Sequence, residues 1–507
     1  MHEKNGIIHK NGLVYIENLN FCYQNAEKCA LHDLELTIHQ GECVLLCGES
    51  GCGKTTVTRL LNGLIPHFYE GKLSGSTTVC GLKTTEEELY TISAHVGSVF
   101  QNPRSQFFCL DTTSEVAFGC ENLGMPEAEV LQRIAQAEKD LHLEKLMGRN
   151  IFHLSGGERQ KIACGSVAAM GPEVMVLDEP TSNLDMDAID ELREALHAWK
   201  KQGKTIVVAE HRLYWLKEIC DRVIYMKEGR IAFDMPMSEF CRFSAEKLRE
   251  LGLRSLSMAD ISLPEEVELP GFCEQNEGRS IELKDYTFSY RSGEGSRREA
   301  LHMDHVSLPA GSILAVTGHN GAGKSTFLRC LCGLEKKFKG RTIIDGEALN
   351  AKAMLKRSYM VMQDVNHQLF SESVEDEIQL GMAEEHQDQV QQVVAELDLT
   401  ELLQRHPMSL SGGQKQRTAI ASATLAGKSI LIFDEPTSGL DYRHMQQTAD
   451  LLKRLRKEND MIFVITHDSE LIADCCTHVF HMEEGTLKEL YPLNAPHRER
   501  FLQQFGY

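Results

Sequence analysis

The chain has 507 residues, of which 42% are hydrophobic and 25% are charged, which is typical of a globular protein and long enough for several domains. Its formal net charge of −21, from 74 acidic and 53 basic residues, opposes nonspecific binding to nucleic acid or to an anionic membrane surface. The N-terminal residues include no apolar signal-peptide segment and no run of 18 uncharged apolar residues occurs, so we expect neither a secretion signal nor a transmembrane helix.

The first predicted element is a strand over residues 13–23, where polar and apolar side chains alternate and an aromatic sequence ends the run. A second copy of this pattern covers residues 281–290. Each strand ends in a tyrosine. Tyr23 precedes Lys54 by 31 positions (54 − 23), and Tyr290 precedes Lys324 by 34 positions (324 − 290). These rings could stack on an adenine base or pack within a sheet, and the sequence leaves both interpretations open.

Each half continues with an apolar strand, a glycine-rich loop and a helical pattern. The loops, residues 48–55 and 318–325, both fit the pattern of Gly, four residues, Gly, Lys, then Ser or Thr. Such glycines let backbone N–H groups converge on phosphate oxygens, and the helix N-terminus adds a favourable dipole. The predicted nucleotide-binding residues are Gly48, Ser50, Gly51, Gly53, Lys54, Thr55 and Thr56 in the first loop and Gly318, Asn320, Gly321, Gly323, Lys324, Ser325 and Thr326 in the second.

Further along, an apolar strand ends at Gln101 in the first half and at Gln363 in the second. A Leu-Ser-Gly-Gly sequence follows in each half and opens a helical stretch with a serine at the N-cap position. The residues of this signature are Ser155, Gly156 and Gly157 in the first half and Ser411, Gly412 and Gly413 in the second.

An apolar strand then ends in Asp-Glu, 23 residues after each signature serine (178 − 155 and 434 − 411). A histidine follows 33 residues after each aspartate (211 − 178 and 467 − 434). The matching intervals predict one fold duplicated in tandem. The acidic residues and histidines are Asp178, Glu179 and His211 in the first half and Asp434, Glu435 and His467 in the second.

The two copies are separated by residues 244–279, which contain Pro264, Pro270 and Gly271 and predict a linker. We therefore expect one domain over residues 1–243 and a second over residues 280–507. The 16 cysteines form no CxxC pair and no metal-site spacing, so we expect reduced thiols in the cytosol.

Together these motifs resemble the nucleotide-binding subunits of ABC transporters over nearly all of both halves, and Leu-Ser-Gly-Gly is specific to that family among P-loop proteins. The resemblance implies an α/β fold with tandem P-loop NTPase domains of ABC type, each with a RecA-like core, an antiparallel β subdomain and a helical signature subdomain. The segments after Gln101 and Gln363 each place a Gln five positions on and a Phe seven positions on. These segments, with residues 62–67 and 210–212, resemble energy-coupling factor (ECF) ATPases, here with two ATPase subunits fused.

Phosphoryl transfer to water depends on positioning and charge stabilisation, and the family resemblance implies ATP and Mg²⁺ as the bound species. It implies that Glu179 and Glu435 polarise the attacking water, that Gln101 and Gln363 complete the shell of metal and water, and that His211 and His467 contact the γ-phosphate. The implied metal-binding residues are Thr55, Gln101, Asp178, Ser325, Gln363 and Asp434. In the family two domains face head to tail, so each phosphate loop would complete its site with the signature of the other half, within one chain.

An ECF-type motor would dock on membrane-embedded coupling and substrate-capture subunits at the cytoplasmic face of the membrane, as a peripheral protein, and drive uptake of a vitamin or metal ion. No nucleic acid is expected as a partner. Residues 106–108 and 368–370 are expected either to meet that partner or to pack inside the helical subdomain. Two alternatives are a soluble tandem ABC protein acting on ribosomes, which would carry a long charged helical linker, and a sugar-importer ATPase, whose second half usually departs from the motifs.

Overall fold

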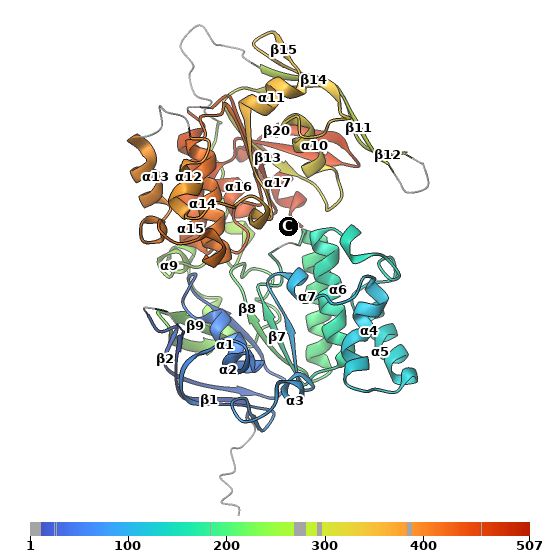
Figure 1. Cartoon of the computed structure of the whole chain (residues 1–507), viewed down its shortest axis with the longest axis vertical. Coiled ribbons are helices and arrows are strands. Elements are labelled where there is room, and N and C mark those ends of the chain that lie inside the picture. The colour runs from blue at the N-terminus through green and yellow to red at the C-terminus, as the bar shows by residue number, and fades with distance from the viewer. Residues whose placement is uncertain are drawn as a thin grey trace, which may run out of the picture. The chain divides into compact units, whose positions relative to one another are not determined.

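The computed structural model of the chain describes residues 12–24, 26, 28–182, 184–267, 280–291, 297–382, 388–457 and 459–506. The chain divides into two compact units, Met1–Leu256 and Ser257–Tyr507. Each unit contains a six-stranded sheet and a four-stranded sheet, and the strand orders in the two units correspond (Figure 1). The predicted tandem α/β fold is confirmed.

The six-stranded core sheet of the first unit has the order β10-β9-β3-β8-β7-β6. All neighbouring strands run parallel except β10, which pairs with β9 in the antiparallel sense. Every residue of β3, β7 and β8 is buried, which explains why these strands read as continuous apolar runs. The strands are β3 (Cys43–Cys47), β6 (Val96–Val99), β7 (Val174–Asp178), β8 (Thr205–Ala209), β9 (Arg222–Lys227) and β10 (Arg230–Pro236).

The two faces of this core sheet are covered by different elements, because successive side chains of a strand point to opposite faces. Leu45 of β3 belongs to a hydrophobic cluster with helices α4 to α7, whereas Val44 and Leu46 belong to a second cluster with helix α1 and an antiparallel sheet. Figure 1 shows α4, α5 and α6 side by side, which is the predicted helical subdomain. The helices of this unit are α1 (Lys54–Leu61), α2 (Leu64–His67), α3 (Leu89–Ser93), α4 (Thr112–Asn122), α5 (Glu127–Asp140), α6 (Gly156–Met170), α7 (Met186–Lys201), α8 (Met237–Phe240) and α9 (Ala245–Glu250).

The four-stranded sheet of the first unit is the predicted antiparallel β subdomain, with the order β2-β1-β4-β5. Strand β1 alternates as expected, and its buried residues, among them Val14 and Phe21, share one hydrophobic cluster with Val57 of α1. The strands are β1 (Gly12–Tyr23), β2 (Leu31–His39), β4 (Gly71–Val79) and β5 (Leu82–Lys83).

The second unit repeats this arrangement, with the orders β16-β17-β18-β13-β19-β20 and β12-β11-β14-β15. Its strands are β11 (Ser280–Arg291), β12 (Arg297–Pro309), β13 (Ser312–Thr317), β14 (Lys339–Ile344), β15 (Glu347–Leu349), β16 (Ser358–Val361), β17 (Ile430–Asp434), β18 (Met461–Ile465), β19 (His478–Glu483) and β20 (Thr486–Pro492). Its helices are α10 (Lys324–Leu331), α11 (Ala351–Arg357), α12 (Val374–Gln379), α13 (Val390–Glu396), α14 (Gly412–Leu425), α15 (Tyr442–Leu455), α16 (Ser469–Cys475) and α17 (Arg498–Gln504).

The boundary between the units falls within the segment predicted as a linker. Leu248 and Leu253 are buried in the helix-side cluster of the first unit, so the start of the segment packs there. Arg498 of the second unit donates a hydrogen bond to the Ile261 carbonyl oxygen at 2.9 Å, so the following residues pack on that unit. Residues 268–279 of the predicted linker lie outside the described residues.

The cysteines depart from the prediction at one place. Cys22 and Cys29 are joined by a disulfide next to Tyr23, so the expectation that every cysteine is a reduced thiol is wrong for this pair. The two cysteines are seven positions apart, near the end of β1 and just before β2, and no spacing motif in the sequence predicted their pairing. Among the described helices, none combines the length and the apolar character needed to cross a membrane.

Candidate functional site

The phosphate loops are held by glycines whose backbone angles other residues rarely adopt. Gly48 and Gly318 have φ values of 145° and 137°. A Cβ atom would collide with the carbonyl oxygen of Met226 at the first position and of Met482 at the second, so only glycine fits. Both loops therefore take the same compact form between a core strand and the first turn of α1 or α10.

The loop lysines are buried where their loops close. Lys54 donates hydrogen bonds from Nζ to the carbonyl oxygens of Gly48 and Glu49, at 2.9 and 3.0 Å. Lys324 makes the matching pair to Gly318 and His319, at 2.6 and 3.0 Å. Each ammonium group is thus fixed beside the backbone of its own glycine-rich loop.

The structure brings each loop hydroxyl to the aspartate that ends a neighbouring strand. Thr55 donates a hydrogen bond from Oγ1 to Asp178 at 3.3 Å, and Ser325 donates from Oγ to Asp434 at 3.2 Å. Burial, together with the nearby Glu179 in the case of Asp178, raises the pKa of each aspartate to about 6, although these hydroxyls and the loop lysines act to lower it. A hydroxyl oxygen beside a buried carboxylate is a donor set that suits Mg²⁺, whose charge would relieve the cost of ionising the aspartate.

The glutamates that follow these aspartates share an unusual backbone conformation. Glu179 and Glu435 have φ values of 47° and 52°, and each donates its N–H to a carbonyl oxygen of the adjacent strand at 2.8 Å. A side-chain amide N–H of Gln101 donates to the Glu179 carboxylate at 2.7 Å, and His211 lies 3.5 Å from that carboxylate. The structure therefore assembles the predicted glutamine, glutamate and histidine around one point.

The second half arranges its glutamate with one different neighbour. His467 lies 3.9 Å from the Glu435 carboxylate, and Thr466 donates a hydrogen bond to that carboxylate at 3.1 Å. Gln363 follows β16 as Gln101 follows β6 and is exposed. The position before the histidine is Thr466 here but Glu210 in the first half, so the two sites differ in charge beside the glutamate.

Glu210 is a buried residue for which the sequence motifs predicted no individual role. It accepts hydrogen bonds from the Thr181 hydroxyl and from the backbone N–H of His211, the latter at 2.9 Å. Burial raises its pKa, and Glu179 raises it further. The corresponding contact in the second half joins Thr437 to Asp468, which follows the histidine, at 2.8 Å. In both halves, a carboxylate next to the histidine therefore connects the loop after Asp-Glu to the segment that contains the histidine.

The strand tyrosines lie at the first turn of the helix that follows each phosphate loop. The Tyr23 hydroxyl shares a hydrogen bond with the Thr56 hydroxyl at 3.2 Å, and the Tyr290 hydroxyl shares one with Thr326 at 3.1 Å. The aromatic residue that fills the hydrophobic core is two positions earlier, Phe21 or Phe288. Tyr290 keeps 44% of its surface exposed, so its ring is accessible beside the loop.

The signature motifs begin helices as predicted. Ser155 and Ser411 are the N-cap residues of α6 and α14, and each forms a reciprocal capping box with the side chain three positions on. Gly156, Gly157, Gly412 and Gly413 form the first turns of these helices. Uncapped N–H groups and the positive end of the helix dipole make such a turn suitable for an anion. In Figure 1, α6 lies in the helical subdomain, apart from α1 of the same unit.

The loops after Gln101 and Gln363 separate their side chains into inner and outer sets. The Gln106 side chain accepts the Phe100 N–H at 3.3 Å and donates to the Ser98 carbonyl oxygen at 3.2 Å, so it shapes its own loop. Phe107 packs against the hydrophobic cluster formed with helices α4 to α7, and its counterpart Leu369 is buried. The next residue in each loop, Phe108 or Phe370, is 75% exposed.

Comparisons with known proteins agree with this geometry. The family profile described as ABC transporter matches residues 31–182 and 301–438. A putative ABC transporter ATP-binding protein of Treponema denticola is 45% identical over 94% of this chain and 97% of its own length. A protein of Bacillus subtilis, described as putative HMP/thiamine import ATP-binding protein YkoD, is 32% identical over 94% of this chain and 90% of its own length.

A solved structure with the same tandem fold is the archaeal ribosome recycling factor aABCE1, in complex with the ribosomal stalk protein aP1. It has a TM-score of 0.62 and 20% identity and covers 96% of this chain and 92% of its own. At that identity the likeness concerns the fold alone. Two matched family regions, two sets of site residues and relatives matched along nearly their whole length lead to one conclusion: this chain belongs to the ABC transporter family and is an ATP-binding, ATP-hydrolysing protein with two ABC ATPase domains.

Proposed function

We propose that this protein is the ATP-hydrolysing motor of an ECF-type importer, which couples ATP binding and hydrolysis to uptake of a vitamin or metal ion through membrane-embedded partners. The observation that carries the proposal is the pair of exposed aromatic residues, Phe108 and Phe370, at matching positions of the two units. Each stands in the loop that begins at the glutamine expected to complete the shell of metal and water at the nucleotide site. A partner bound at these loops would therefore be coupled to the nucleotide sites.

The residues around each nucleotide site have the chemistry that hydrolysis needs. Thr55 with Asp178, and Ser325 with Asp434, would hold Mg²⁺, which neutralises phosphate charge when bound. Glu179 and Glu435 would accept a hydrogen bond from the attacking water and orient it toward the γ-phosphate. Phosphoryl transfer requires little covalent work from the protein, so this positioning and the lysine charge supply most of the catalysis.

We also propose that the two halves complete each other's sites within one chain. The phosphate loop of Lys54 would pair with Ser411, Gly412 and Gly413, and the loop of Lys324 would pair with Ser155, Gly156 and Gly157. Asp185 and Asp441, which cap α7 and α15, would lie across the same interface. Both sets of residues are intact, so both sites would hydrolyse ATP.

The exposure of Phe108 and Phe370 favours contact with a protein partner over packing inside the helical subdomain. Phe107 and Leu369 already fill the inner position of each loop, which leaves the next aromatic residue of each loop for an outside contact. A helix from a membrane subunit could lay an apolar face over such a side chain, as in other helix recognition. The protein would then act as a peripheral subunit on the cytoplasmic face of the membrane.

The relatives support transport more than action on ribosomes. The Bacillus subtilis relative is named for HMP/thiamine import, whereas the likeness to the ribosome recycling factor rests on fold at 20% identity. The second half keeps every motif, which also differs from the pattern expected of a sugar-importer ATPase. We therefore retain a single candidate function.

The test is co-purification of membrane proteins with the tagged full chain. Phe108→Ala combined with Phe370→Ala should lose the membrane partner while the basal ATPase rate of the purified protein stays within about twofold, because neither side chain touches the site. The control, Tyr90→Ala with Leu355→Ala, removes two other exposed apolar side chains, 75% and 50% exposed, and should keep the partner. Recovery with ribosomes instead of membrane proteins, or equal loss in both variants, would contradict the proposal.

A further inference from the structure

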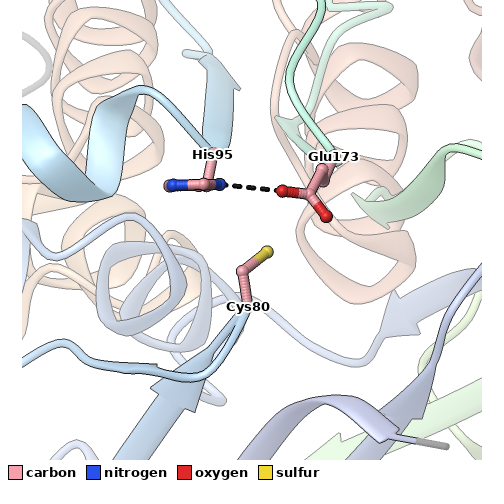
Figure 2. A group of neighbouring side chains, drawn as sticks. All are labelled: Cys80, His95 and Glu173. Carbon is pink, nitrogen blue, oxygen red and sulfur yellow. Dashed lines mark hydrogen bonds and ion pairs between the residues drawn. The ribbon is translucent and has the colours of Figure 1, made fainter.

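Three metal-ligating side chains of the first unit meet outside the nucleotide site. One ring nitrogen of His95, Sγ of Cys80 and one carboxylate oxygen of Glu173 lie within 4.8 Å of one another. Figure 2 shows His95 and Glu173 facing each other, with the sulfur of Cys80 directed toward the space between them. The His95 Nδ1 atom is 2.8 Å from the Glu173 carboxylate.

The three side chains come from separate segments whose backbones are tied together. Cys80 occupies the turn between β4 and β5, and its N–H donates to the Leu13 carbonyl oxygen of β1 at 2.9 Å. His95 immediately precedes β6, and its carbonyl oxygen accepts the N–H groups of Glu173 and Val174, both at 3.0 Å. The cluster thus joins the antiparallel β subdomain to the core sheet, with its positions set by backbone hydrogen bonds.

This cluster is remote from the chemistry of ATP. His95 and Glu173 precede β6 and β7, so they lie at the N-terminal edge of the parallel core sheet. The phosphate loop follows β3 and Asp178 ends β7, so the nucleotide site lies at the opposite, C-terminal edge. None of the three residues belongs to the predicted nucleotide or Mg²⁺ set.

We propose that Cys80, His95 and Glu173 form a Zn²⁺ site that clamps the β subdomain of the first unit to its core sheet. Thiolate, imidazole and carboxylate are the three side-chain ligands that Zn²⁺ uses, and their mixture is unsuited to Mg²⁺ or Ca²⁺, which take oxygen ligands. The His95 and Glu173 side chains are 40% and 51% exposed, so an ion can enter from solvent and keep a water as its fourth ligand.

The bond lengths of zinc are compatible with small side-chain movements. Ligand atoms about 2.0–2.3 Å from a tetrahedral ion are roughly 3.3–3.8 Å from one another. The distance between His95 Nδ1 and the Glu173 carboxylate oxygen would increase from 2.8 Å by roughly half an ångström. The Cys80 sulfur, which lies within 4.8 Å of the other two ligand atoms, would move closer to them. Rotation about side-chain bonds suffices for both changes, so the backbone hydrogen bonds above need not break.

The second unit offers an internal comparison, because it has the same backbone without the ligands. The turn between β14 and β15 places Asp345 where the first unit has Cys80, with φ values of 52° and 53°. The residues that precede β16 and β17 are Arg357 and Ser429, in the places of His95 and Glu173. An arginine cannot ligate a metal, so this unit should bind no ion at that position.

Cobalt is a suitable probe, because Co²⁺ takes the place of Zn²⁺ and a cobalt–thiolate bond absorbs in the near ultraviolet. The metal-stripped, nucleotide-free full chain should bind one equivalent of Co²⁺ with a sulfur-to-cobalt band and the visible bands of a tetrahedral ion, and Zn²⁺ should displace it. Cys80→Ser should abolish the sulfur band. The control Cys241→Ser, which removes an exposed cysteine elsewhere, should retain it.

His95→Gln leaves the cysteine turn intact and should weaken Co²⁺ binding by at least about tenfold, since even outer-shell partners of a metal site typically matter that much. The basal ATPase rate should be unchanged in all three variants, which verifies folding independently of the metal. If Cys80→Ser fails to fold by that measure, the His95→Gln titration decides. A missing sulfur band in the wild type, or a band and affinity that survive Cys80→Ser or His95→Gln, would overturn the proposal.

Discussion

The buried carboxylate of Glu115 accepts the backbone N–H of the exposed Phe108 at 2.9 Å, and Glu377 accepts that of Phe370 at the same distance. Each carboxylate also accepts the next N–H along the loop, at 2.7 Å from Cys109 and 2.8 Å from Ser371. A glutamate on the first helix after the loop thus holds the aromatic residue outward in both units. The duplication of the fold extends to this detail of the loop.

Glu115→Ala should destabilise the first unit and loosen its partner loop. Two N–H groups would lose a buried charged acceptor, which typically costs about 1–3 kcal/mol. We expect that loss in the free energy of unfolding from denaturant melts, together with weaker recovery of the membrane partner. Glu121→Ala removes an exposed glutamate from the same helix and should change neither quantity. Equal stability of the two variants would show that the Glu115 hydrogen bonds contribute little.

Glu179→Gln and Glu435→Gln should each reduce ATP turnover while ATP still binds. Loss of one electrostatic group that acts in the transition state typically lowers the rate by a factor on the order of 10²–10³. If the two sites act together, either substitution should remove well over half of the total ATPase activity in a steady-state assay. Glu194→Gln, at an exposed position on α7, is the matched control. A near-normal rate in either active-site variant would mean that its site contributes little to turnover.

Asp178 and Asp434 should make the nucleotide-free protein less stable at neutral pH than in mild acid. Their pKa values of about 6 in the folded protein lie above the ordinary value of 3.8, so folding favours their protonated forms. The stabilisation that the protonated aspartates give the folded protein is complete below pH 3.8 and is lost as the pH rises through 6.

Replacing both aspartates by asparagine removes this dependence. The double variant should gain up to roughly 3 kcal/mol per site in free energy of unfolding at pH 7. The gain should shrink as the pH falls from 6 toward 4, and Mg²⁺ with ATP should no longer stabilise the variant. Denaturant melts across this pH range, without and with Mg²⁺ and ATP, measure both effects. A gain independent of pH would assign the effect to something other than these carboxylates.

Tyr23→Ala combined with Tyr290→Ala should raise the KM for ATP. Stacking of a base on an aromatic ring is typically worth about 1–3 kcal/mol, so an increase of about fivefold or more is expected. Tyr23→Phe with Tyr290→Phe keeps the rings and removes only the hydroxyl contacts to Thr56 and Thr326, and should change the KM by less than about threefold. Similar KM values for the Ala and Phe variants would indicate that the hydroxyls, and not the rings, position the nucleotide.

Features that depend on chemistry within a short stretch of chain could be predicted from the amino-acid sequence. A phosphate loop needs glycine at positions such as Gly48 and a lysine such as Lys54 at a set spacing, so its fold and ligand can be read from eight residues. The repeated intervals predicted two copies of one fold, because equal spacings between strands, loops and helices require equal topology. The N-cap serines of α6 and α14 were predictable for the same reason, since capping acts within one helical turn.

Contacts between residues far apart in the chain could not be predicted from the sequence and became visible in the folded protein. It brings Cys80, His95 and Glu173 together because β6 and β7 are neighbours in the core sheet although their sequences are not adjacent. The disulfide between Cys22 and Cys29 could not be predicted from sequence motifs, because the distance between two sulfur atoms depends on how the chain between them folds. Which of two adjacent aromatic residues faces outward, Phe107 or Phe108, depends on a buried glutamate seven residues past Phe108, and sequence spacing does not encode burial.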